Sequence, residues 1–298
     1  MRRIAIASAA LIAILALSGC ASSSAAADGK LRIVASTDVY GDIAQSIGGG
    51  AVHVTSIISD PSQDPHSYEG DAQVQLSLSQ ADVVIANGGG YDDFVTTLLG
   101  GVHNDDAVVL NAAKISGLNQ HPSSGEFNEH LWYDFPTVKK VADKIAATLS
   151  RLAPKDADKF ATNVAAFDEQ LATLEKEEAS IKSTAMGAGA AITEPVPLYM
   201  LSASGIVNKT PAAFSEAIEN GTDVSPAVLQ QTLALFSQHS VKLLAYNEQT
   251  TGPETVAVLK AAKNAGVAIV PVTETLPANT HYLAWMKANL DAIRSAVS

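Results

Sequence analysis

Short apolar runs rich in β-branched residues alternate along this chain with longer segments whose apolar residues recur at helical spacing. Such runs predict β-strands, and the segments between them predict α-helices. Regular alternation of the two is typical of βα units built around parallel sheets. The sequence therefore predicts an α/β fold with eight strands, over residues 31–35, 52–58, 82–86, 107–110, 189–193, 205–207, 241–246 and 267–272.

The two halves of the chain resemble each other in pattern. Residues 81–99 and residues 241–262 each run from an apolar strand through a turn into a helix. With about 270 residues beyond the N-terminal segment, two lobes of roughly 100–150 residues each fit the usual size of a domain. The pattern therefore predicts two similar lobes.

The segment between the two halves has a different amino-acid composition. From Phe135 to Ser183 the chain has no glycine and is dense in Ala, Lys, Glu and Leu, and Pro154 divides it into helices over 136–152 and 155–183. The second helix would be about 40 Å long at 1.5 Å per residue. That length suits a helix linking two Rossmann-like βα lobes, although an ordinary surface helix is the alternative. The expected divisions are an N-terminal lobe over 30–152, a linking helix over 153–184 and a C-terminal lobe over 185–298.

The N-terminus predicts export and a lipid anchor. Arg2 and Arg3 precede an apolar run that extends to Leu17, the pattern of a signal peptide over residues 1–19. The run ends in Leu17-Ser18-Gly19-Cys20, which resembles a bacterial lipobox, where cleavage exposes a cysteine for acylation. The Ser- and Ala-rich stretch over 20–29 then suits a flexible tether. We expect a protein attached through Cys20 to the outer face of the cell membrane.

Charge and cysteine usage exclude several classes of protein. The formal net charge of −12 disfavours nucleic acid as a partner. Because Cys20 is the only cysteine, the chain has no internal disulfide and no thiolate cluster for a structural metal. Neither a closely spaced metal-binding histidine pair, nor a nucleophile elbow, nor a phosphate-binding loop is present. Any site must therefore be assembled from distant residues.

Two of the seven histidines lie in unusual surroundings. His66 follows Asp64-Pro65 shortly after a predicted strand, so a rigid turn presents it at the end of that strand. This is where α/β folds place ligand-binding groups. His130 lies in Asn128-Glu129-His130-Leu131-Trp132, just before a predicted helix. Taken singly, either histidine also suits a surface or capping role.

The motifs DPHSYE around His66 and HLWYDFP from His130 resemble the two histidine motifs of the cluster A-I (ZnuA/TroA-like) family, the substrate-binding lipoproteins of zinc and manganese ABC transporters. The resemblance extends over nearly the whole exported chain. It implies that a cleft between the lobes holds one divalent metal ion. It also implies that the partners are a membrane permease and its ATPase, and that the protein is a monomeric binding protein rather than an enzyme.

In this family two further ligands come from the C-terminal lobe. The matching positions are Glu194, after the first strand of that lobe, and Glu274, after its last strand. Glu248, after another strand, is the competing candidate. Two neutral imidazoles and two carboxylates would neutralise a dication, which lowers the cost of enclosing it between lobes. Asp64, Glu129 and Asp134 are candidates to hold the second nitrogen of each imidazole.

The ligand set leans toward manganese. Carboxylates suit Mn²⁺ and imidazoles suit Zn²⁺, and Glu194 stands where zinc-binding members more often have histidine. Against this, the Irving–Williams order favours Zn²⁺ at almost any nitrogen and oxygen site.

Two other functions remain open on the sequence: a two-lobed receptor for a metal chelate or vitamin, and a secreted metallohydrolase with Glu194 or Glu248 as general base.

Overall fold

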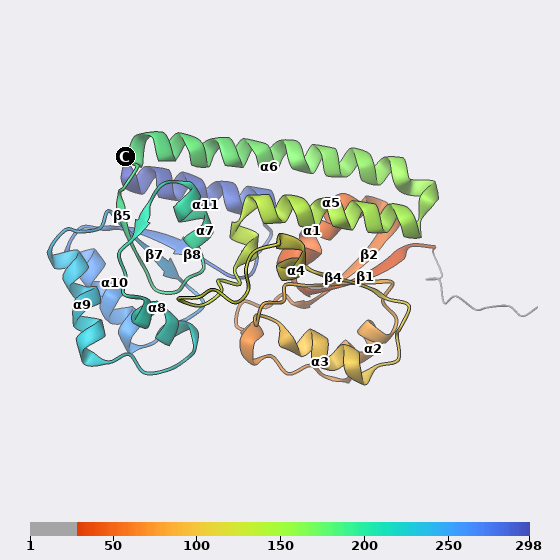
Figure 1. Cartoon of the computed structure of the whole chain (residues 1–298), viewed down its shortest axis with the longest axis horizontal. Helices are drawn as coiled ribbons and strands as arrows, with labels where there is room; N and C mark the ends of the chain where they lie inside the picture. The colour runs from red at the N-terminus through yellow and green to blue at the C-terminus, as the bar shows by residue number, and fades with distance from the viewer. Residues whose placement is uncertain (1–28) are drawn as a thin grey trace, which may run out of the picture.

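The computed structural model describes residues 29–298, which form two lobes side by side (Figure 1). The predicted signal peptide and the predicted acylation site at Cys20 lie outside the described residues. No helix among residues 29–298 is long and apolar enough to cross a membrane.

The N-terminal lobe contains a four-stranded parallel sheet in the order β2-β1-β3-β4. All four strands follow the apolar runs of the sequence, and β1 and β3 are almost completely buried. The strands are β1 (Leu31–Thr37), β2 (Val52–Ile58), β3 (Val83–Ala86) and β4 (Val108–Asn111), and the helices are α1 (Asp38–Gly48), α2 (Ala72–Ser79), α3 (Asp93–Gly101), α4 (Ala112–Ser116) and α5 (Phe135–Leu152). Short 3₁₀ turns occur at Gly49–Ala51, Pro65–Ser67, Leu131–Tyr133 and Pro154–Asp156.

The C-terminal lobe repeats the same arrangement in the order β6-β5-β7-β8, again all parallel. Thus β3 and β7, which begin the two similar sequence segments, hold equivalent places in their sheets, and all eight predicted strands are present. The strands are β5 (Gly189–Ile192), β6 (Val207–Asn208), β7 (Leu243–Asn247) and β8 (Ala268–Val272), and the helices are α7 (Leu198–Ala203), α8 (Ala212–Glu219), α9 (Pro226–Ser237), α10 (Pro253–Asn264) and α11 (Tyr282–Val297).

Helix α6 (Ala157–Ala185) joins the lobes and runs along both of them (Figure 1). It packs against α1 and α5 in the N-terminal lobe and against α7 and α11 in the C-terminal lobe. Its buried residues, among them Phe160, Phe167 and Leu174, are spread along its length. Of the two alternatives that the sequence left open, the linking helix is the one found.

The lobes share a hydrophobic core and several direct hydrogen bonds. One cluster of buried residues extends from β1 and α1 through α6 to β5, β7 and α11. The hydroxyl of Tyr282 donates to the carbonyl of Trp132 at 2.7 Å, and the hydroxyl of Tyr133 donates to the carbonyl of Thr273 at 3.0 Å. Because these bonds and the core cross between lobes, the loops that meet there are held in a fixed relation.

Candidate metal centre

The loops that follow the carboxyl ends of strands in both sheets meet between the lobes. The side-chain amide of Gln249, after β7, donates to the carbonyl of Pro61, after β2, at 2.8 Å. The amide of Asn128 likewise donates to the carbonyl of Pro195, after β5, at 3.2 Å. Carboxyl ends of parallel strands are the usual ligand-binding edge of α/β sheets. These contacts therefore bring the ligand-binding edges of the two lobes together.

His66 is presented by a capped 3₁₀ turn. Pro65 begins the turn, and the carboxylate of Asp64 accepts the backbone N–H of His66 at 2.9 Å. The imidazole stands edge-on to the ring of Tyr91, with ring centroids 5.2 Å apart. This packing leaves the side chain 28% exposed, with its Nε2 atom directed at the carboxylate of Glu219, 3.3 Å away. The predicted rigid turn therefore exists and aims the imidazole between the lobes.

His130 is completely buried beside Tyr91 and Trp132. Its Nδ1 atom lies 2.8 Å from the side-chain oxygen of Asn128, so Asn128, and not one of the three acidic neighbours predicted, is the acceptor. An Nδ1–H bond to that oxygen leaves Nε2 unprotonated and able to bind a metal. That Nε2 atom is buried and has no hydrogen-bond partner.

Glu194 and Glu274 approach the same place from the C-terminal lobe. Glu194 follows β5 and is 4% exposed; Glu274 follows β8 and is 8% exposed. One oxygen of Glu274 accepts the side-chain amide of Asn247 at 2.9 Å, and the other lies 3.9 Å from Nε2 of His130. The Oε2 atoms of both glutamates are buried without a hydrogen-bond partner. His66, Glu194 and Glu274 thus line one opening between the lobes, and Glu274 also approaches His130.

A fifth residue, Glu219, was missed by the sequence reasoning. It is the last residue of α8, and its Oε1 atom lies 3.3 Å from Nε2 of His66 and 3.4 Å from Nε2 of His130. The helix dipole disfavours a carboxylate at the C-terminal end of a helix. This unfavourable position is the one feature of the sequence that could have drawn attention to Glu219. No motif marked Glu219, because only the tertiary fold brings the end of α8 to the two histidines.

Two other acidic residues differ sharply in placement. Glu129 lies 3.8 Å from Nε2 of His66, and His66, Glu129 and Glu219 together form a group of potential ligand atoms within 4.8 Å of one another. Glu248, the competing candidate, is exposed, and its backbone N–H bonds to the carbonyl of Val272 at 3.1 Å. The structure therefore gathers Glu129 with the buried carboxylates but leaves Glu248 on the surface.

Burial and crowding of like charges shift the pKa values of the cluster. Burial, followed by the charge of Glu219, raises the pKa of Glu194 to about 7 and that of Glu274 to about 8. Burial lowers the pKa of His130 to about 4. Burial also opposes the charged form of His66, but the close contact with Glu219 and its negative charge outweigh it and raise the pKa of His66 to about 9. Near neutral pH His66 and part of these carboxyl groups therefore hold protons, which a bound cation would displace.

The cluster borders two openings. One, of about 650 Å³, is lined by residues that include Glu194 and Glu274; the other, of about 380 Å³, is lined by residues that include Glu129 and Asn128. His66 and Glu219 line both. The donor set therefore lies between two solvent-filled hollows and consists only of imidazole and carboxylate groups, which suit a divalent transition metal.

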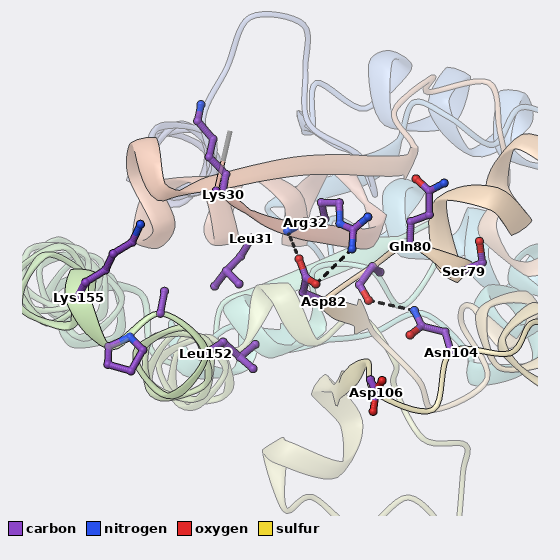
Figure 2. A pocket seen from close by; sticks show the side chains of 14 residues that line it. Lys30, Leu31, Arg32, Ser79, Gln80, Asp82, Asn104, Asp106, Leu152 and Lys155 are labelled. Atoms are coloured by element: carbon purple, nitrogen blue, oxygen red, sulfur yellow. Dashed lines mark hydrogen bonds and ion pairs between the residues drawn. The ribbon is translucent and has the colours of Figure 1, made fainter. Parts of the chain in front are cut away.

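Another pocket, of about 710 Å³, lies away from this cluster, at the amino end of the N-terminal sheet. Figure 2 shows it, with the Arg32–Asp82 ion pair at 3.4 Å and the amide of Asn104 bonded to the chain at Ala81. None of the residues lining it is a histidine or a buried, unpaired carboxylate. Its lining gives no sign of a metal site.

The fold consists of two α/β lobes joined by a long helix, with a cluster of imidazole and carboxylate groups between the lobes. The chain belongs to the family described as zinc-uptake complex component A, periplasmic, whose model matches residues 33–296.

Individual relatives agree with this assignment. The chain is 33% identical to the manganese-binding lipoprotein MntA of Bacillus subtilis over 174 residues, which is 56% of each protein and thus little more than half the relative's length. It is 26% identical to the metal ABC transporter substrate-binding lipoprotein FimA of Streptococcus parasanguinis over the full length of both. The periplasmic zinc-binding protein TroA of Treponema pallidum has the same fold, with a TM-score of 0.73 at 20% identity over 91% of this chain and all of TroA.

Proposed function

We propose that this protein captures one divalent transition metal ion between its lobes and delivers it to the permease of an ABC importer. One observation carries the proposal: buried ligand atoms without protein partners converge there. They are Nε2 of His130, Oε2 of Glu194, Oε2 of Glu274 and both carboxylate oxygens of Glu219. Buried polar atoms normally have partners, because leaving them unpaired costs free energy. A metal ion would satisfy several of them at once.

Manganese is the favoured ion. The four ligands proposed from the sequence, His66, His130, Glu194 and Glu274, comprise two carboxylates and two imidazoles, and oxygen ligands favour Mn²⁺ relative to Zn²⁺. The relatives support either metal, since MntA is a manganese-binding lipoprotein and TroA a zinc-binding protein.

We further propose that residues 1–19 are removed on export and that Cys20 is acylated. Residues 20–29 then tether the protein, as a monomer, to the outer face of the cell membrane. The lobes correspond to 30–152 and 185–298, with 153–184 as the link. Metal transport rather than catalysis is the proposed role, because the described site offers imidazoles and carboxylates but no arranged set of donors for an oxyanion.

Metal analysis tests the main proposal. The chain from Ala21, expressed without acylation, should take up one Mn²⁺ or Zn²⁺ ion per molecule from an equimolar mixture. His130→Ala should lose that ion, whereas His103→Ala, which alters an exposed histidine in the loop after α3, should retain it. Unchanged metal content in His130→Ala would refute the proposed site.

A fractionation experiment tests the anchor separately. Full-length protein should stay with the membranes, whereas Cys20→Ser should lose acylation. Labelling with a radioactive fatty acid distinguishes the two, and equal incorporation in both would rule out Cys20 as the acylation site.

A further inference from the structure

Glu219 occupies a position that a carboxylate reaches only at a cost. It ends α8, where the helix dipole disfavours negative charge. Both of its oxygens are buried without a hydrogen-bond partner, although the side chain as a whole is 10% exposed. The fold nevertheless holds it there, because Phe214 and Ile218 of the same helix are buried in the core of the C-terminal lobe.

The distances around Glu219 match those between ligands of one metal ion. Its Oε1 atom lies 3.3 Å from Nε2 of His66 and 3.4 Å from Nε2 of His130. Ligand atoms bound tetrahedrally at about 2.0–2.2 Å lie roughly 3.3–3.6 Å from one another. Both contacts fall in that interval. The oxygen thus lies at a distance from each imidazole that suits two ligands of one ion.

A second observation is independent of Glu219 itself. Nε2 of His130 is fully buried, carries no hydrogen-bond partner and is left unprotonated by the Asn128 contact at Nδ1. It therefore offers a lone pair toward Glu219, and a carboxylate cannot supply a proton to that lone pair while ionised. A cation between Nε2 and the carboxylate satisfies both groups.

We propose that Glu219 is a further metal ligand, supplied by α8 in addition to the histidines and to Glu194 and Glu274. This inference rests on the proposed function. Three carboxylates around a dication leave the site with a charge of −1 instead of the neutral sum expected from the sequence. The added oxygen ligand favours Mn²⁺ relative to Zn²⁺, which needs fewer ligands and accepts imidazole more readily.

Substitution of Glu219 separates this inference from the proposed function. Mn²⁺ and Zn²⁺ affinities are measured by competition titration for the wild type, Glu219→Gln, Glu219→Ala and the matched control Asp223→Asn. Asp223 is an exposed acid four residues further along the chain. We expect Glu219→Gln and Glu219→Ala to bind Mn²⁺ roughly 10- to 100-fold more weakly and to lose less affinity for Zn²⁺. Asp223→Asn should bind both as the wild type does.

The coordination of the bound ion provides a second readout. A crystal structure of the Mn²⁺-loaded wild type should show an oxygen of Glu219 within about 2.3 Å of the ion, and Glu219→Gln should keep its melting temperature without metal. If Glu219 is displaced from the loaded site, or if both variants bind Mn²⁺ as tightly as the wild type, the inference is wrong while the metal-binding function stands. If the wild type binds neither ion, both proposals fail.

Discussion

Asn128 contacts the imidazole of His130 and also links the two lobes by a hydrogen bond. Its side-chain oxygen lies 2.8 Å from Nδ1 of His130, and its side-chain amide donates to the carbonyl of Pro195 at 3.2 Å. Its own carbonyl accepts the hydroxyl of Tyr199 at 2.8 Å. One residue of the N-terminal lobe therefore fixes the orientation of a proposed ligand and binds the loop that carries Glu194.

Replacement of this residue should weaken metal binding without removing a ligand. We expect Asn128→Ala to lower the affinity for Mn²⁺ or Zn²⁺ about 10- to 100-fold, the usual cost of losing a group that orients a metal-binding histidine. Competition titration measures the change. Asn119→Ala, the same substitution at an exposed position of the preceding loop, is the control. Equal affinities for the two variants would contradict the orienting role.

Metal binding should release protons and strengthen as pH rises. The pKa of His66 is raised to about 9 and that of Glu274 to about 8, so both groups carry protons near pH 7 in the metal-free protein. A metal must displace those protons, and the affinity should therefore rise between about pH 6 and 9. An unperturbed imidazole would place this change near pH 6.5; the carboxylates around His66 move it upward. Calorimetric titration in buffers of different ionisation enthalpy measures the protons released. An affinity constant throughout this range would show that the prediction is wrong.

Gln249 should matter for affinity although it is not a proposed ligand. Its amide donates to Pro61 of the other lobe at 2.8 Å and to the hydroxyl of Thr275 at 2.9 Å, while its oxygen accepts the backbone N–H of Thr275 at 3.2 Å. We expect Gln249→Ala to loosen the loop bearing Glu274 and to reduce metal affinity about 10-fold, by analogy with other groups that orient ligands. Gln170→Ala on the exposed face of α6 serves as the comparison and should bind normally.

A buried carboxyl in the linking helix should make stability depend on pH. Glu178 of α6 is 5% exposed, and burial, followed by the charges of Glu175 and Asp134, raises its pKa to about 8. The folded protein therefore keeps a proton that the unfolded chain loses near pH 4.3, so the free energy of unfolding should fall as pH rises from about 4.5 to 8. Glu178→Gln should abolish this fall in the free energy of unfolding with rising pH.

The expected gain for Glu178→Gln at pH 8 is on the order of 4 kcal/mol. Urea denaturation of the metal-free protein at about pH 5 and pH 8 measures it. Glu169→Gln, an exposed substitution on the same helix, should leave the pH dependence unchanged. A Glu178→Gln protein that loses as much stability as the wild type over this interval would exclude Glu178 as the cause.

The local pattern of apolar and polar residues was sufficient to predict most strands and helices of this fold. The central strands β3 and β5 were found where predicted because their apolar runs are buried within a sheet, whereas the strand predicted over 205–207 overlaps the two-residue β6 only at Val207. Helix α10 (Pro253–Asn264) likewise follows local signals, because a proline can begin a helix and Gly266 adopts the left-handed conformation after it. The 29-residue length of α6 followed equally from an uninterrupted helical composition, although its packing on both lobes did not.

The sequence by itself also predicted that Asp64 and Pro65 present His66 in a rigid turn at the end of a strand, but joining His66 and His130 in one site needed the resemblance to the family motifs. Only the tertiary structure decided which acidic residues join them. Glu248 and Glu274 both follow strands of one sheet, yet one is exposed and the other is 8% exposed between the lobes. Glu219 reaches both histidines from the end of α8, more than eighty residues away from either in sequence. Proximity of this kind depends on how whole lobes pack, and local periodicity carries no information about it.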